Sequence, residues 1–167
     1  MGVSGLLPVL RSVTDQVHVS KYAGRTVGVD AMGWLYKGAT RAEWKAKAKK
    51  LIQEQDGEED GRAVFAACMR AVSVTNEMVM KLIAVLRRMD ITFYVAPYEA
   101  DAQLAFLSRQ KIVDVVISDD SDCVPYGVKT VLLKLTPDGW GSELKRRSLG
   151  ANEELSFVGW TEEMVSR

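Results

Sequence analysis

The stretch VAPYEADAQLAFLSRQKIVDVVISDDSD, residues Val95–Asp122, determines how the rest of the chain is organised. It contains two acidic pairs with the same spacing, Glu99 with Asp101 and Asp120 with Asp122. Each pair stands beside a short apolar run rich in β-branched residues, which is typical of a buried strand. The stretch therefore combines predicted strands with closely spaced carboxylates.

The second acidic pair follows the apolar run Val113–Ile117, which predicts a buried strand. In an open parallel sheet, ligands collect at the carboxyl ends of the strands. Side chains two residues apart point the same way on an extended backbone, so Asp120 and Asp122 are expected to face one point. Adjacent carboxylates repel each other unless a cation neutralises them. Oxygen ligands suit a hard divalent ion, so the pattern predicts an Mg²⁺ or Mn²⁺ site.

Composition limits the class of protein. A chain of 167 residues predicts one domain with a sizeable core. A hydrophobic content of 47% with 26% charged residues is typical of a folded globular protein. The formal net charge is +0, so any binding of nucleic acid has to come from local basic patches. The only cysteines, Cys68 and Cys123, favour a reducing compartment, and no apolar run suggests a membrane partner.

Asp30 occupies a position like that of Asp120. The segment Thr26–Asp30 predicts a compact buried strand that ends on this acid. Asp30 is a candidate metal ligand on that ground. It is equally a candidate N-cap for a helix that begins near Ala31, as Asp often is. Both interpretations stay open for Asp30 alone.

The first acidic pair follows another predicted strand, Ile91–Val95, and falls in the first turn of an amphipathic helix over Tyr98–Gln110. Acids in a first helical turn are ordinary complements of the helix dipole. Thr130–Leu135 is also predicted to be a strand. Strands that alternate with helices predict an α/β fold with a largely parallel central sheet flanked by helices.

All the predicted strand ends that carry acids then lie at one edge of the sheet. Helix capping explains each acid separately, but it does not predict that all of them follow strands. The joint pattern favours a metal site over independent caps. The candidate metal ligands are Asp30, Glu99, Asp101, Asp120 and Asp122.

A basic segment, residues 41–55, predicts a helix that begins at Arg41. Its cations are either contacts for DNA phosphates or a solvated helix face, and the sequence leaves both open. In the first case, replacing Lys45, Lys47 and Lys49 by Ala should flatten the salt dependence of DNA binding, by about 0.9 in the log–log slope for each phosphate that is no longer neutralised.

The segments MGVSGLL, VDAMGWLYKGA, APYEADAQLA and ISDDSD resemble the XPG-type structure-specific 5′-nuclease family, and most closely its mismatch-repair exonuclease members. The resemblance implies a PIN-like nuclease core in the nucleus that acts in DNA repair or replication. It implies hydrolysis of phosphodiester bonds at DNA 5′ ends or flaps, with two Mg²⁺ (or Mn²⁺) ions and with repair or replication proteins as possible partners. The five carboxylates match metal-binding acids of the family, and Gly2 and Arg41 match residues close to the reacting phosphate.

The chain also departs from the family pattern. Ala39 leads almost directly into the basic helix, and the Phe-Asp-Gly segment that ends a strand in the family is absent. The family's C-terminal helical DNA-binding element is not expected either. We therefore expect a single nuclease core over residues 1–167, in which an N-terminal region 1–39 and an internal region 62–167 are joined by helix 41–55. An alternative function is a catalytically impaired DNA-binding or scaffold module that retains part of the metal site.

Overall fold

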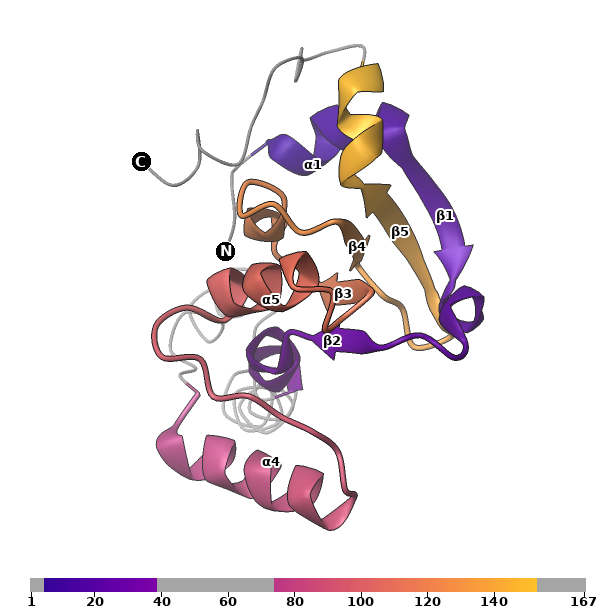
Figure 1. Cartoon of the computed structure of the whole chain (residues 1–167). Helices are drawn as coiled ribbons and strands as arrows, with labels where there is room; N and C mark the ends of the chain where they lie inside the picture. The colour runs from indigo at the N-terminus through magenta and orange to yellow at the C-terminus, as the bar shows by residue number, and fades with distance from the viewer. Residues whose placement is uncertain (1–4, 39–73, 153–167) are drawn as a thin grey trace, which may run out of the picture. The chain divides into compact units, whose positions relative to one another are not determined.

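The computed structural model describes residues 5–38 and 74–152 (Figure 1). Two compact units divide the chain, one formed by Met1–Asp30 with Val95–Arg167 and the other by Ala31–Tyr94. Gly2, Arg41 and the basic segment 41–55 lie outside the described residues, so their predicted roles stay predictions. Within the described ranges, no helix is both long and apolar enough to cross a membrane.

A five-stranded sheet forms the first unit, in the order β1-β5-β4-β3-β2 (Figure 1). Strands β2, β3 and β4 run parallel, whereas β5 and β1 extend the sheet in antiparallel fashion. The α/β fold with a central sheet flanked by helices is therefore confirmed. The strands are β1 (Thr14–His18), β2 (Val27–Val29), β3 (Val115–Ser118), β4 (Thr130–Leu133) and β5 (Trp140–Lys145).

Strand β3 lies at the centre of the core because both of its faces are covered. All four of its residues are buried, and successive side chains alternate between two apolar clusters. Val116 packs in the cluster that contains α5 (Ala100–Arg109), whereas Val115 and Ile117 pack in the other. Helix α5 approaches β2 closely, since a Cβ atom at Gly28 would lie 3.2 Å from Leu104 Cδ2.

The face of the sheet opposite α5 contains a buried carboxylate. Glu143, on β5, is 2% exposed and accepts a hydrogen bond from the Tyr22 hydroxyl at 2.7 Å. Its other oxygen pairs with Lys21 Nζ at 2.7 Å and Lys145 Nζ at 2.8 Å. A buried acid inside a strand is tolerated here because cations and a hydroxyl satisfy both oxygens.

The remaining elements are short apart from one helix. Helix α4 has Thr75 as its N-cap, whose side chain accepts a hydrogen bond from the backbone N–H of Met78 at 3.3 Å. The short helices are α1 (Leu6–Val9), η1 (Leu10–Val13), η2 (Val19–Tyr22), η3 (Ser121–Cys123) and η4 (Arg146–Ala151), and α4 covers Asn76–Arg88.

One predicted strand is absent, and one observed strand was not predicted. Ile91–Val95 forms no strand, and Ile91, Tyr94 and Val95 are exposed. A β-branched sequence forms a strand only when a neighbour supplies the ladder of backbone hydrogen bonds, and none of the described strands pairs with this segment. Conversely, Trp140–Lys145 forms β5 between β1 and β4, although the sequence offered no strand pattern there.

Candidate metal centre

Three carboxylates meet beyond the carboxyl end of β3. Asp101, Asp120 and Asp122 each offer an oxygen, and these atoms lie within 4.8 Å of one another. Asp101 comes from the first turn of α5, whereas the other two come from the turn that follows β3. The three side chains are half-buried, so they are accessible to an ion but partly shielded from water.

The turn after β3 differs from the extended backbone that the sequence suggested. Asp120 is the N-cap of η3, and its carboxylate accepts a hydrogen bond from the backbone N–H of Asp122 at 3.1 Å. This local bond fixes Asp120 relative to Asp122 by the same chemistry that caps longer helices. The two acids therefore approach each other through a tight turn and not through strand periodicity.

Asp30 joins the group indirectly, through Ser118. The Ser118 hydroxyl donates to Asp30 Oδ2 at 3.1 Å and accepts from the backbone N–H of Asp120 at 3.0 Å. The backbone N–H of Asp30 donates to the carbonyl of Ile117 at 2.9 Å, which continues the pairing of β2 with β3. Asp30 also directly precedes the helical residues 31–38. Its carboxylate is thus buried beside the three clustered acids, but it is not one of them.

Asp101 carries the clearest electrostatic signature of the site. Burial raises the pKa of Asp101 above its ordinary value, a hydrogen bond from the Cys123 thiol opposes that rise, and the charges of Asp30, Asp120 and Asp122 raise it further. The Cys123 Sγ lies 3.3 Å from Asp101 Oδ1. Burial and the neighbouring acids raise the pKa of Cys123 as well, so the thiol stays protonated and serves as a donor.

This donor set fits a hard divalent cation. Several carboxylates raise one another's pKa when they share a small volume, and a cation relieves that repulsion. The oxygens of Asp101, Asp120 and Asp122 are close enough to contact one ion, and carboxylate oxygen is the ligand that Mg²⁺ and Mn²⁺ prefer. The arrangement can therefore concentrate positive charge at the edge of the sheet where β2, β3 and β4 end.

Glu99 is not one of the three clustered acids. It is the N-cap residue of α5, and its carboxylate accepts a hydrogen bond from the hydroxyl of Tyr126. This bond, followed by the charge of Glu99, raises the pKa of Tyr126.

The sequence analysis missed two residues of the site, Ser118 and Cys123, which bond to Asp30 and Asp101 respectively. Both residues stand next to the DDSD segment in the sequence, and this position beside the acids was the only sign of their role.

Comparison with known proteins gives concordant matches along the sequence. The XPG N-terminal domain model matches residues 1–56, and the XPG I-region model matches residues 90–165. Exonuclease 1 of Oryza sativa subsp. japonica is 30% identical over 99% of this chain and 26% of its own length. Exonuclease 1 of Xenopus laevis is 32% identical over 98% of this chain and 29% of its own length.

Solved structures share the fold. The catalytic core of Rad2 in complex with DNA substrate matches with a TM-score of 0.70 and 21% identity, over 93% of this chain and 58% of that one. The Holliday junction-resolving enzyme GEN1 in complex with product DNA and Mg²⁺ matches with a TM-score of 0.56 and 17% identity, over 90% of this chain and 42% of that one.

The chain is shorter than its relatives both overall and within the aligned part. It spans between about a quarter and a third of the length of the two exonucleases. The alignment with the rice protein runs over 216 residues, whereas this chain has 167, so tens of positions in the relative have no counterpart here. This agrees with the expected absence of an internal segment. Because the two XPG models together match most of the sequence and the fold is shared with Rad2 and GEN1, the chain belongs to the XPG family.

Proposed function

We propose that this chain is the core of a metal-dependent DNA nuclease that hydrolyses phosphodiester bonds in DNA repair or replication. The observation that carries the proposal is the meeting of Asp101, Asp120 and Asp122 at the carboxyl edge of the parallel strands, within 4.8 Å of one another. The relationship to exonuclease 1 supports DNA as the substrate, and this edge is where α/β folds bind ligands.

The protein's part in this chemistry is mainly electrostatic. A bound Mg²⁺ or Mn²⁺ supplies a Lewis acid for the phosphate oxygens and lowers the pKa of water. Asp101, Asp120 and Asp122 would hold the ion, and Asp30 would add a further negative charge close to Asp101. Ser118 and Cys123 keep two of these carboxylates in place through hydrogen bonds. Such preorganised charge is generally the largest contribution a protein makes to phosphoryl chemistry.

We further propose that the nuclease cleaves DNA at 5′ ends or 5′ flaps. We also propose that the intact site of the family holds two ions. The chain itself is expected to bind one ion well and the second weakly. Asp101, Asp120 and Asp122 form one oxygen cluster, whereas Glu99 is engaged by Tyr126 and Asp30 stands outside the cluster. In-line displacement needs both the attacking and the leaving oxygens stabilised, so this chain should cleave DNA slowly.

The second candidate function follows from the same observation. A core that binds an ion but lacks part of the site would act as a DNA-binding or scaffold module of a repair complex. The residues of the relatives that have no counterpart here favour this candidate. The two functions differ in one measurable property, Mg²⁺-dependent cleavage.

The test compares three proteins on a 5′-flap duplex and on a recessed duplex, each with Mg²⁺ and with EDTA. They are the 167-residue chain, its Asp120→Asn variant and an Asp15→Asn control, which removes one exposed carboxylate on β1. Slow cleavage that Asp120→Asn abolishes and Asp15→Asn leaves intact supports the nuclease. Absence of Mg²⁺-dependent cleavage together with retained DNA binding supports the scaffold module. Robust cleavage would show that the expected loss of the second ion is wrong.

Location and protein partners are further proposals. A nuclease of genomic DNA is expected in the nucleus, where repair or replication proteins are its natural partners. Fluorescence of a tagged chain that is confined to another compartment would contradict the proposed location.

A further inference from the structure

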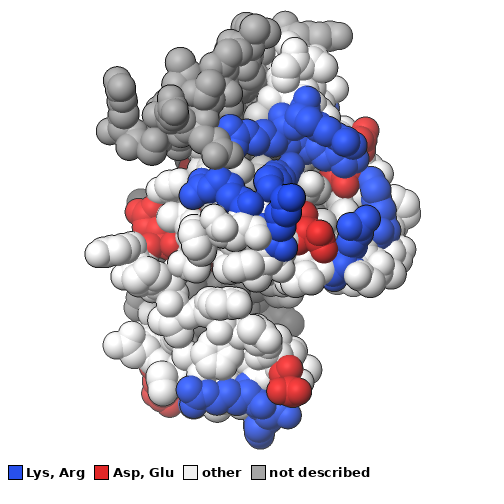
Figure 2. Space-filling model, viewed as in Figure 1, with Lys and Arg blue, Asp and Glu red and all other residues white. Residues whose placement is uncertain are grey.

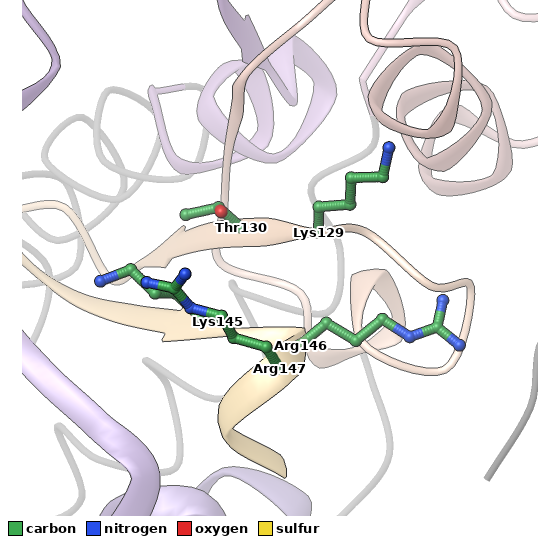
Figure 3. A pocket seen from close by; sticks show the side chains of 5 residues that line it. All are labelled: Lys129, Thr130, Lys145, Arg146 and Arg147. Atoms are coloured by element: carbon green, nitrogen blue, oxygen red, sulfur yellow. The ribbon is translucent and has the colours of Figure 1, made fainter.

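A basic hollow lies at the opposite edge of the sheet from the acids. It has a volume of about 620 Å³ and is lined by Lys129, Thr130, Lys145, Arg146 and Arg147. Figure 3 shows the first two at the start of β4 and the other three at the end of β5 and the start of η4. Its volume is in the range of ordinary ligand sites, but its lining consists of four cations and a hydroxyl.

Strand direction separates the hollow from the candidate metal centre. Strands β3 and β4 are parallel, so the acids follow the carboxyl ends whereas Lys129 and Thr130 stand at the amino end of β4. Because β5 is antiparallel, its last residue pairs with Thr130 and brings the basic run back to this same end. Lys145, Arg146 and Arg147 are consecutive in the sequence, whereas Lys129 joins them only because β4 pairs with β5.

Lys129 and Arg147 are the exposed cations of the hollow. Lys129 Nζ donates to the carbonyl of Arg109 at 3.2 Å, which orients this cation without neutralising it. Arg146 donates to the carbonyl of Gly127 at 3.4 Å and has further contacts. Lys145 pairs with Glu143, but that carboxylate is shared with Lys21. Figure 2 shows basic side chains gathered on the face that carries η4 and the loop before β4, in a chain whose formal net charge is +0.

We infer that this hollow binds phosphates of a nucleic-acid backbone, as a second contact separate from the metal centre. The inference rests on the proposed function, which supplies the polyanion. Lysine and arginine neutralise phosphates, and Thr130 adds a hydroxyl that donates to a phosphate oxygen. The lining residues include no aromatic side chain on which a base would stack, so the contact reads the backbone and not the base sequence.

The hollow is a contact of its own, because it stands at the amino end of β4 whereas the acids stand beyond the carboxyl end of β3. Clusters of arginine also recognise phosphorylated peptides, and that ligand is an alternative outcome of the test.

The experiment measures binding of a fluorescein-labelled 20-base-pair duplex by anisotropy, in EDTA so that cleavage does not interfere, over a series of NaCl concentrations. The variants of the full chain are Lys129→Glu, Arg147→Glu and the double variant, because both side chains are exposed and their replacement should leave the fold intact. The control is Arg88→Glu, which makes the same change in net charge in the last turn of α4. Thermal melts of each variant check folding.

We expect the log–log salt slope to fall by about 0.9 for each phosphate that is no longer neutralised, so by roughly 2 in the double variant. Arg88→Glu should keep the slope of the parent. An unchanged slope in the folded double variant would overturn the inference. Tighter binding of a doubly phosphorylated serine peptide than of the duplex, abolished in Arg147→Glu, would also overturn it and assign the hollow to a phosphoprotein.

The outcomes of the two tests are separable. A lowered slope without flap cleavage would leave the basic hollow standing and remove the nuclease proposal. Cleavage that depends on Asp120, with an unchanged slope, would do the reverse.

Discussion

The hydroxyl of Ser118 connects two acids that are 90 residues apart in the sequence. It donates to Asp30 Oδ2 at 3.1 Å and accepts from the backbone N–H of Asp120 at 3.0 Å, so the end of β2 and the turn after β3 share one hydroxyl. Ser118 is 1% exposed, and water does not readily replace it. Ser118 therefore helps to hold Asp30 relative to the metal centre, although it is not itself one of the three clustered acids.

Replacing Ser118 by Ala should weaken both metal binding and the fold. Losing a residue that orients ligands typically costs about 10- to 100-fold in metal affinity, and leaving a buried partner unsatisfied costs about 1–3 kcal/mol of stability. Titration with Mn²⁺ by calorimetry measures the affinity. The matched control is Ser108→Ala, whose equally buried hydroxyl accepts from the backbone N–H of Lys129 at 3.2 Å. Equal metal affinity in the two variants would contradict the positioning role of Ser118.

Asp101→Asn should stabilise the metal-free protein. Because burial and the neighbouring acids raise the pKa of Asp101, the folded state holds its proton more tightly than the unfolded state does. Stability is therefore lost as pH rises from the ordinary value of 3.8 through the raised pKa, and a neutral Asn avoids that loss. Thermal melts at pH 7 should show a higher Tm without metal and a smaller increase on adding Mg²⁺. A lower Tm in EDTA would mean that repulsion among the acids is not the dominant effect.

Glu143 should give the fold its sensitivity to acid. Burial alone would raise its pKa, but hydrogen bonds from Lys145, Lys21 and Tyr22 outweigh burial and lower the pKa from 4.5 to about 2. The ionised carboxylate thus stabilises the fold above about pH 4.5, and this contribution is lost as pH falls toward 2. Glu143→Gln should cost about 3 kcal/mol at pH 7 and much less near pH 2.

Denaturant unfolding at the two pH values measures this difference. The control is Glu77→Gln, which removes an exposed pair with Lys81 of 2.6 Å and should cost less than about 0.5 kcal/mol at either pH. A Glu143→Gln penalty that does not change with pH would assign the loss to packing instead of charge.

Gly141 should be intolerant of a methyl group. A Cβ atom there would lie 2.9 Å from Leu132 Cδ1 and 3.0 Å from the carbonyl oxygen of Leu133, so β4 would have to move away from β5. Gly141→Ala is expected to cost about 1–3 kcal/mol in unfolding free energy. Gly150→Ala is the control, since a Cβ atom there meets nothing within 4 Å. Equal stability of the two variants would show that the sheet adapts without cost.

Two of the parallel strands were predictable from their own residues, although β2 is less buried than expected, with Val29 exposed. The segments at Val27–Val29 and Val115–Ser118 are short and apolar, and both observed strands fall within or beside the predicted ones. Strand β5 was not predictable, because its buried Glu143 is compatible with a strand only when Lys21 and Tyr22, distant in sequence, lie beside it.

The candidate metal centre shows the same limit. Equal spacing made the pair Glu99–Asp101 look like the pair Asp120–Asp122, yet their backbones differ. Glu99 is the N-cap of α5 and Asp101 lies in the first turn, and side chains two apart on a helix do not face each other. Asp120 meets Asp122 through a capping bond that spacing alone does not specify. The backbone turn after β3, and not the two-residue spacing in the sequence, decides which acids converge.

The opposed edges of the sheet form an electric dipole within a protein whose formal net charge is +0. Carboxylates collect where the parallel strands end and cations collect where β4 begins, although the whole chain sums to +0. Because the formal net charge is +0, the field of a polyanion attracts such a molecule only weakly. The same field rotates the molecule so that its basic edge faces the polyanion. Loading the acidic edge with divalent ions shrinks this dipole, so metal should change how the protein orients on a charged surface before it changes how strongly the protein is attracted.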